Sequence, residues 1–335
     1  MRAFVLPSYG SPESLTLTDV DRPEPAHDEV LVRVRATSVN PYDWHHIRGE
    51  PYVARLMPGG FGLRRPGLRI LGGDVAGQVE AVGRDVTKFR PGDDVFALVP
   101  GGGFGEYASV REDLLAPKPK NLSYDEAAAV PMAAITALLS VRDEGRIQPG
   151  QRVLVNGASG GVGTFAVQLA RAFGAEVVGV CGAANEDLVR SIGAHDVVDY
   201  ATEDFTRSGR RYDLVLDCAG SQSISACLRV LERTGAFVVV GGQAGRWLQP
   251  AGRMFSSLAL KPFVSQRMAM TDTVRSTEHR QNLLTLTELI EDGRVRPVID
   301  RRYSFEEIPA AVAFQEAGHA RGKVVVTGST GSSPP

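Results

Sequence analysis

The clearest pattern of hydrophobic and polar positions lies in residues 152–176, RVLVNGASGGVGTFAVQLARAFGAE. It opens with an apolar, largely β-branched run at 153–155, which is typical of a strand that a parallel sheet buries on both faces. Apolar residues then recur at helical spacing from Val162 to Phe173, and Gly174 follows as a helix-ending glycine. The segment therefore predicts a buried strand, a glycine-rich turn and an amphipathic helix.

Strands and helices continue to alternate as far as about residue 242. Short apolar runs predict strands at 177–180, 197–199, 214–217 and 237–240, separated by helical stretches at 187–192 and 221–231. This alternation indicates an α/β fold with a doubly wound parallel sheet.

The first 120 residues are predicted to be mainly β structure. Alternating apolar and polar residues at 30–36 predict a half-buried strand, 71–83 predicts a strand pair or one bent strand, and 95–99 predicts a further strand. The glycine- and arginine-rich segment 58–69 is either a mobile flap over a site or a solvated surface loop.

Helical signals return near Ser123, which has the sequence of a capping box with Glu126. We expect a helix through 127–139, although it contains Pro131. After residue 270 the pattern predicts helices at 281–292 and 305–316, strands at 298–303 and 323–326, and a disordered tail at 329–335.

Composition narrows the class of protein. The 335 residues are 43% hydrophobic and 23% charged, as expected for a soluble globular protein of two domains. A formal net charge of −2 gives no field to recruit nucleic acid or an anionic membrane, and no apolar run is long enough to span a bilayer. The first ten residues lack the features of a signal peptide, and three cysteines indicate no disulfide framework, so we expect a cytoplasmic location.

The glycine-rich turn predicts the chemistry of the central segment. Its glycines let the backbone approach a diphosphate closely, and the free N–H groups of the following helix favour an anion. The strand before the turn and the helix and strand after it favour dinucleotide binding over a tight turn without a ligand. No Gly-Lys-Ser/Thr ends the turn, which excludes a nucleoside-triphosphate loop. We expect cofactor contacts at Gly157, Ser159, Gly160, Gly161 and Val162.

The end of the second strand bears on the choice between NADP(H) and NAD(H). An NAD-type site usually places an Asp or Glu there to bind the ribose 2′-OH. Here Cys181, Gly182 and Asn185 include no acid, so a 2′-phosphate meets no repulsion and NADP(H) is favoured. Arg190 either helps to bind that phosphate or is a solvated helix residue. Cys218, which follows the strand at 214–217, is expected at the cofactor-facing end of the sheet.

Several motifs along nearly the whole chain carry a family resemblance. They are SVNPYD at 38–43, LGGDVAG at 71–77, RPGD at 90–93, AAVP at 128–131 with Thr136, NGASGGVG at 156–163, IGA at 192–194, VVGG at 239–242 and GHARGK at 318–323. The chain resembles the medium-chain dehydrogenase/reductase superfamily, in its zinc-independent quinone-oxidoreductase, or zeta-crystallin-like, branch.

The resemblance implies a GroES-like β-barrel catalytic domain and a Rossmann domain, with the cofactor in the cleft between them, and a homodimer. The implied parts are the N-terminal catalytic part at 1–125, the NAD(P)-binding domain at 126–268, and the return to the catalytic domain at 269–328. The resemblance also assigns cofactor contacts to Asn40, Thr136, Tyr200, Gly241, Gly242, Phe263 and Lys323.

No metal site is predicted. The catalytic zinc of related alcohol dehydrogenases needs a cysteine near position 40 and a His-Glu pair, whereas this chain has Asn40 and Gly73-Asp74. His45 and His46 are adjacent on what we expect to be an extended segment, where they would point to opposite sides. That geometry disfavours a separate metal site with Asp43.

Without a metal Lewis acid, reduction of a quinone or an α,β-unsaturated carbonyl needs less assistance than an alcohol–carbonyl interconversion. The candidate catalytic residues are Asn40, Asp43, His45 and Tyr52. His45 stands about where this branch often carries a tyrosine, and it is either a proton donor or a packing residue. The competing functions are an enoyl-thioester reductase, a catalytically silent NADPH-binding protein and a zinc alcohol dehydrogenase.

Overall fold

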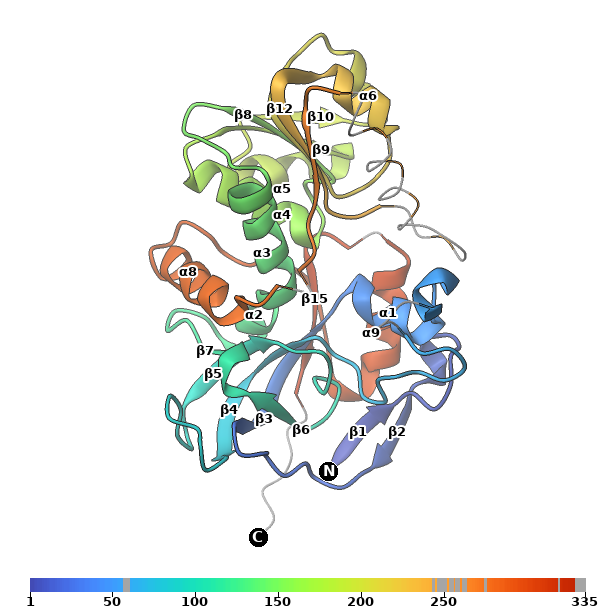
Figure 1. Cartoon of the computed structure of the whole chain (residues 1–335), viewed down its shortest axis with the longest axis vertical. Helices are drawn as coiled ribbons and strands as arrows, with labels where there is room; N and C mark the ends of the chain where they lie inside the picture. Colours follow the sequence, from blue (N-terminus) through green and yellow to red (C-terminus); the bar gives the residue numbers. More distant parts are fainter. Residues whose placement is uncertain are drawn as a thin grey trace. The chain divides into compact units, whose positions relative to one another are not determined.

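The computed structural model describes residues 1–56, 61–242, 245, 252, 256, 260, 264–273, 276–318 and 320–328. The chain forms two compact units (Figure 1). Unit 1 comprises Met1–Met132, Ser276–Glu291 and the chain from Ile299 onward, and unit 2 comprises Ala133–Arg275 and Asp292–Val298. Phe263, the tail 329–335 and part of the expected flap, residues 58–60, lie outside the described residues.

Unit 2 is built on a parallel sheet that, among the described residues, has the strand order β10-β9-β8-β11-β12-β13. The strands are β8 (Arg152–Asn156), β9 (Glu176–Cys181), β10 (Asp196–Asp199), β11 (Tyr212–Asp217), β12 (Leu231–Val239) and β13 (Arg267–Met270). Numbered within the sheet, this order is 3-2-1-4-5-6, the doubly wound order of dinucleotide-binding folds. The strand order reverses between β8 and β11, which pair directly, and ligands bind such sheets at the carboxyl ends of the strands there.

The helical elements of unit 2 are α3 (Pro131–Leu138), which begins in unit 1, a π-helical turn (Leu139–Glu144), α4 (Gly161–Ala172), α5 (Glu186–Ser191), α6 (Ile224–Arg229) and the 3-10 turns Ala183–Asn185 and Phe205–Arg207. Val153, Leu154 and Val155 in β8 are all fully buried, as their apolar run predicts. Leu154, Val215 and Phe237 belong to one buried cluster that fixes β8, β11 and β12 as a rigid platform.

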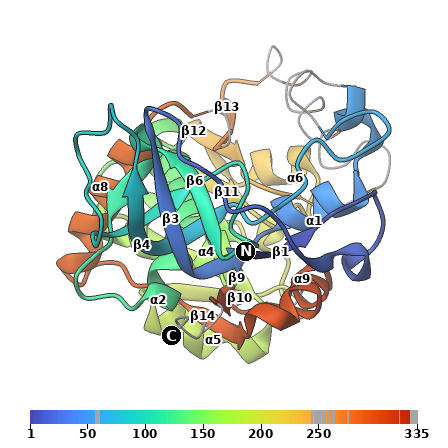
Figure 2. The same cartoon turned by 90° about the horizontal axis from the view of Figure 1, so that it is seen from below.

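Unit 1 contains a largely antiparallel sheet, whose described strands follow the order β14-β15-β3-β4-β5-β7, with β6 also paired to β3. Figure 2 shows β3 with its neighbours β4 and β6. The strands are β3 (Glu29–Val39), β4 (Asp74–Val82), β5 (Asp94–Leu98), β6 (Tyr107–Arg111), β7 (Leu115–Pro117), β14 (Ile299–Tyr303) and β15 (Lys323–Thr327), beside a separate pair β1 (Arg2–Val5) and β2 (Thr16–Asp19). The helices are α1 (Pro41–Arg48), α2 (Tyr124–Ala128), α8 (His279–Glu291) and α9 (Ile308–Glu316), with 3-10 turns at Pro12–Ser14, Tyr52–Leu56, Glu112–Leu114 and Phe305–Glu307.

The C-terminal strand returns to the N-terminal sheet. β15 pairs antiparallel with β3, with Val324 opposite Val39 and Val326 opposite Thr37. Spacing along the sequence could not establish this pairing. It brings Lys323, at the start of β15, beside the end of β3.

The predicted fold class is confirmed, because the structure combines a GroES-like β unit with a parallel Rossmann-type sheet. The expected helix 127–139 is wrong in one respect. The chain leaves α2 at Ala128 and starts α3 at Pro131, because proline lacks an N–H group and disfavours helical geometry in the residue before it. The expected helix 221–231 is shorter, and Leu231 already belongs to β12. No helix in the described part of the chain combines the length and apolar character that crossing a bilayer requires.

Candidate active site

The glycine-rich turn places an open helix N-terminus at the carboxyl end of β8. Gly157 turns the chain with φ +90°, a conformation that favours glycine, and Gly160 is the N-cap residue of α4. No side chain of the described residues caps this N-terminus. The first N–H groups of α4 and the positive end of the helix dipole are therefore free to bind an anion.

Two glycines of this turn have different packing. A Cβ on Gly163, in the first turn of α4, would lie 2.0 Å from the Gly157 carbonyl oxygen, so the helix packs against the turn only because Gly163 has no side chain. A Cβ on Gly160 would meet only that same oxygen, at 3.5 Å. Gly163 is thus a packing requirement, whereas the surroundings of Gly160 are open.

The end of β9 forms the second part of the unit 2 site. Gly182 lies beside the ring of Tyr200, whose side chain is 68% exposed, and Asn185 Nδ2 donates to Ser159 Oγ at 3.3 Å. Asn185 Oδ1 is buried and has no hydrogen-bond partner among the described residues. Arg190 forms an ion pair with Asp196 at 3.5 Å.

Cys181 and Cys218 lie at the ends of β9 and β11. Burial raises the pKa of Cys181 to about 11, with Glu186 and Asp199 adding to the effect, and burial raises the pKa of Cys218 to about 12. Neither thiol is a thiolate near neutral pH, so neither is a nucleophile. Gly241 packs closely on Cys218, because a Cβ there would lie 2.8 Å from the Cys218 carbonyl oxygen. Gly242 follows Gly241 in the same segment after β12.

A buried hydrogen-bonded pair that sequence reasoning missed links the ends of β8 and β11, where the strand order of the sheet reverses. Asn156 Nδ2, at the end of β8, donates to Asp217 Oδ1, at the end of β11, at 2.8 Å. Asp217 is fully buried and also accepts from the Gly220 N–H at 3.0 Å. Their positions at strand ends were visible in the sequence, but their pairing depends on β8 and β11 being neighbours.

Thr136 lies on α3 and is 9% exposed. Its hydroxyl hydrogen-bonds the Thr273 hydroxyl at 2.7 Å, and Ser140 Oγ donates to the Thr136 carbonyl at 2.6 Å. The first of these contacts ties Thr273, in the segment after β13, to α3.

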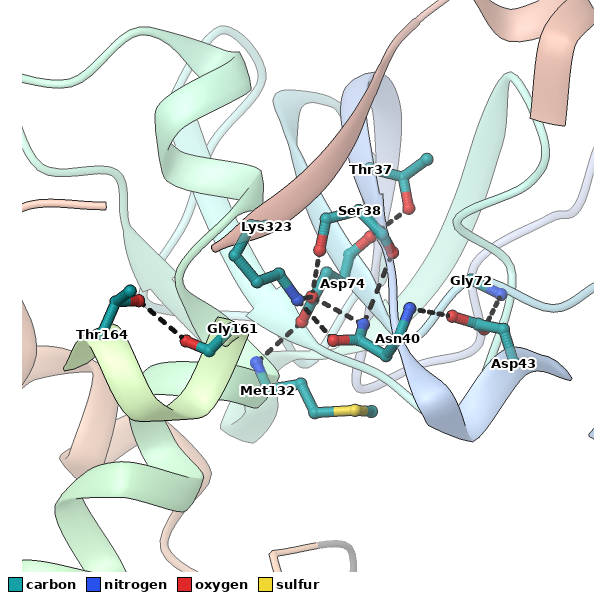
Figure 3. Close-up of polar contacts among 10 residues, drawn as sticks. All are labelled: Thr37, Ser38, Asn40, Asp43, Gly72, Asp74, Met132, Gly161, Thr164 and Lys323. Carbon is teal, nitrogen blue, oxygen red and sulfur yellow. Dashed lines mark hydrogen bonds and ion pairs between the residues drawn. The ribbon is translucent and has the colours of Figure 1, made fainter. Parts of the chain in front are cut away.

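Unit 1 contains a buried polar network made of Ser38, Asn40, Asp74 and Lys323 (Figure 3). Lys323 Nζ donates to Asn40 Oδ1 and lies 3.3 Å from Asp74 Oδ2, with side-chain exposures of 3% for the lysine and 0% for the aspartate. Asp74 Oδ2 also accepts from Asn40 Nδ2 at 2.8 Å and from Ser38 Oγ at 2.5 Å. The buried charges are therefore paired and hydrogen-bonded, as burial requires.

Asp43 lies in the first turn of α1 and is fully buried. Its carboxyl oxygens accept from the Asn40 N–H at 2.8 Å and the Gly72 N–H at 3.0 Å. Burial raises the pKa of Asp43 to about 7, although these two hydrogen bonds favour the ionised form. Asp43 thus fixes the backbone around Asn40.

His45 and His46 lie on helix α1, so the expectation of an extended segment is wrong. Proline is favoured in the first turn of a helix, where Pro41 lies, and Asp43 completes a capping box with Asn40. Both signals are present in the sequence but were not used to predict a helix. The His45 ring stacks on the Trp44 ring, with 3.7 Å between the ring centroids. His45 Nδ1 lies 2.7 Å from the Glu50 carbonyl oxygen, and His46 Nδ1 lies 2.8 Å from the Tyr42 carbonyl oxygen. Burial lowers the pKa of His45, and it lowers the pKa of His46 to about 4.

Comparison with known proteins agrees with this architecture. Residues 26–120 match the alcohol dehydrogenase GroES-like domain, and residues 192–326 match the zinc-binding dehydrogenase family. The chloroplastic quinone-oxidoreductase QR1 of Triphysaria versicolor is 32% identical over 341 residues, covering 97% of this chain and 98% of the relative. The chain belongs to the medium-chain dehydrogenase/reductase superfamily.

Further members of the superfamily resemble the chain over nearly its full length. The mitochondrial NAD(P)H oxidoreductase RTN4IP1 of Bos taurus is 34% identical, covering 97% of this chain and 89% of the relative. Among solved structures, the quinone oxidoreductase of Coxiella burnetii has a TM-score of 0.84 at 28% identity, covering 98% and 99% of the two chains. The CurK enoyl reductase has a TM-score of 0.84 at 26% identity, covering 97% and 98%.

The predicted site residues of this superfamily member fall into two groups, one in each unit. Unit 2 brings the predicted cofactor residues of 157–162, 181–185, 218 and 241–242 to the carboxyl ends of β8, β9, β11 and β12, with Tyr200 just after β10. Unit 1 brings Asn40, Asp43 and Lys323 together. Tyr52 is half-buried on the turn Tyr52–Leu56, where the Arg55 guanidinium lies 4.8 Å from its ring centre.

Asp74 is the functional candidate in unit 1 that sequence reasoning missed. Its position was noted only as the place where related zinc enzymes carry a metal-binding pair. In the described residues, no cluster of three or more His, Cys, Asp or Glu side chains could hold a metal ion. The Asp74 carboxylate instead binds the Lys323 ammonium.

Proposed function

We propose that the protein is an NADPH-dependent oxidoreductase that reduces a quinone or an α,β-unsaturated carbonyl without a metal. The observation that carries the proposal is the uncapped N-terminus of α4 at the strand-order reversal of a doubly wound sheet. The sequence likeness to proteins named quinone oxidoreductases supports the choice of acceptor.

The residues of unit 2 fit a dinucleotide. The N–H groups at Gly161 and Val162 suit a diphosphate, and the open space at Gly160 admits it. As the amide stands, the buried Asn185 Oδ1 can accept a hydrogen bond from a ligand. If the amide turns by 180°, Oδ1 accepts from the Ser159 hydroxyl instead and the NH2 group can donate to the ligand. A ribose hydroxyl or a 2′-phosphate can therefore be satisfied there, and the lack of an acid in 181–185 favours the phosphate. The bound nicotinamide supplies the hydride.

Unit 1 supplies polar groups for the acceptor. The second N–H of the Asn40 amide has only a long 3.4 Å contact to the Ser38 carbonyl, so it is the N–H most easily redirected to a substrate oxygen. Because a carbonyl only accepts, the His45 ring must carry its proton on Nδ1, and the neutral ring has an acceptor at Nε2. His45 is thus a poor proton donor, and we propose that water protonates the product.

Steady-state oxidation of NADPH and, separately, of NADH tests the proposal. The purified, metal-analysed protein is assayed with one simple benzoquinone and one conjugated enal. We expect faster turnover with NADPH in the absence of bound zinc. Tight NADPH binding without turnover of either acceptor would favour the binding-protein alternative, a preference for NADH would refute the cofactor choice, and activity that requires zinc would refute the metal-free reaction.

An enoyl-thioester reductase is the second candidate, and the likeness to the CurK enoyl reductase favours it. The same hydride addition would reduce a carbon–carbon double bond conjugated to a thioester. Crotonyl thioester in the same NADPH assay distinguishes the two, because a simple quinone reductase would turn it over much more slowly than the benzoquinone. A homodimer and a cytoplasmic location stay predictions, and light scattering checks the first.

A further inference from the structure

The amide of Asn40 is held by a pair of opposite charges, one at each end. Lys323 Nζ donates to Oδ1, and Asp74 Oδ2 accepts from Nδ2 at 2.8 Å (Figure 3). An ammonium group has only donors and a carboxylate has only acceptors. Turning the amide by 180° would place N–H groups against the ammonium and an oxygen against the carboxylate. The pair therefore permits one orientation of Asn40.

Asp74 is itself fixed by three further contacts. Its Oδ2 accepts from Ser38 Oγ at 2.5 Å, its Oδ1 accepts from the Met132 N–H at 2.7 Å, and its carbonyl accepts from Thr37 Oγ1 at 2.6 Å. Met132 is the second residue of α3, so the carboxylate also caps that helix from a distant strand. The ammonium is thus bound to a rigid anchor rather than to a mobile side chain.

We propose that Lys323 is a positioning residue, which acts with Asp74 to aim the second Asn40 N–H at the acceptor. The assignment rests on the function proposed above. It gives Lys323 a role through Asn40 rather than a direct contact to a cofactor phosphate, consistent with a side-chain exposure of only 3%. Removing the ammonium releases the amide, and misplacing a substrate-positioning group can cost about 10²-fold in rate.

A double-mutant cycle tests the proposal. Lys323→Met alone would leave the Asp74 carboxylate buried and unpaired, so the test uses Lys323→Met combined with Asp74→Asn, which removes both charges together. We expect kcat/KM for the acceptor to fall by about 10²-fold with an unchanged circular dichroism spectrum. In an Asn40→Ala background the same two substitutions should change kcat/KM by less than about twofold. An equal fall in both backgrounds would overturn the proposal.

Hydrogen exchange of the Asn40 side-chain NH2, followed by NMR, is a readout independent of catalysis. We expect it to be about tenfold or more faster in the pair-neutral variant, Lys323→Met combined with Asp74→Asn, because exchange follows local opening. Lys118→Met is the matched control, since this half-buried lysine of unit 1 binds the carbonyls of Pro119 and Leu122 outside the network. Unchanged Asn40 exchange in the pair-neutral variant would overturn the positioning role. If the wild type reduces no acceptor while Asn40 exchange responds as expected, the proposed function fails and the positioning of Asn40 stands.

Discussion

Replacing Gly163 by alanine should break the packing between the glycine-rich turn and helix α4. The new Cβ would lie 2.0 Å from the Gly157 carbonyl oxygen and 2.9 Å from both Gly157 C and Ala158 Cα, all of them backbone atoms. Alanine gains about 1 kcal/mol over glycine in a helix, but overpacking typically costs about 1–3 kcal/mol and backbone cannot rotate aside. Because the contact is with backbone at 2.0 Å, we place the overpacking cost at the upper end of that range and expect a net loss of about 2 kcal/mol in the free energy of unfolding.

Urea unfolding followed by circular dichroism measures this loss, and NADPH titration by fluorescence measures the effect on the site. Gly160→Ala is the matched control, because its Cβ would meet only one oxygen at 3.5 Å and its φ of −81° suits alanine. The control should unfold within about 1 kcal/mol of the wild type. It is a control for stability alone, because Gly160 lies in the proposed diphosphate site. Gly163→Ala should also bind NADPH more weakly than the wild type, because the turn shifts. A Gly163→Ala protein as stable as the wild type would refute the packing argument.

Three further predictions concern single side chains. The pKa of Asp43 is raised from 3.8 to about 7, so the folded protein holds more protons than the unfolded chain between about pH 4 and 7. The free energy of unfolding relative to Asp43→Asn should therefore fall by up to about 4 kcal/mol as pH rises through that window, and a pH-independent difference in urea titrations would contradict this. Cys218 is partly exposed, but with a pKa of about 12 its thiol should stay protonated and react slowly with iodoacetamide at pH 8 in the native protein, and rapid labelling seen by mass spectrometry would argue against the raised pKa. Ser123→Ala removes the N-cap of α2 and should lower the free energy of unfolding by about 1 kcal/mol, whereas Ser123→Asp should retain most of it.

The sequence predicted unit 2 well because its signals are local. Apolar runs such as 153–155 are long enough to identify buried strands, and the glycines at 157–163 identify the turn between β8 and α4. Helix α1 was missed because its eight residues, PYDWHHIR, are too few and too polar to show a clear helical periodicity. Only Pro41 and Asp43 signalled a helix start. The break at Pro131 was visible in the sequence, but apolar periodicity alone favoured one continuous helix.

The polar network of unit 1 could not be predicted from the sequence. Asn40, Asp74 and Lys323 are far apart in the chain, and their contacts exist only because β3 pairs with β4 on one side and with β15 on the other. Register decides the result, because shifting either pairing by one residue would turn the side chains to the opposite face. A lysine in the motif GHARGK is compatible with exposure as well as with burial, so only the pairing reveals its partner.

The late arrival of β15 has a consequence for synthesis of the chain. Until residues 323–327 leave the ribosome, the end of β3 is an open strand edge and the Asp74 carboxylate lacks its ammonium partner. Unit 2 is complete about 25 residues earlier, at Val298. Domains usually fold in order from the N-terminus, but here the inserted unit can close first. Nascent chains should thus expose an unpaired strand edge at the end of β3, in the N-terminal part that leaves the ribosome first. That edge is the surface that a chaperone would have to shield.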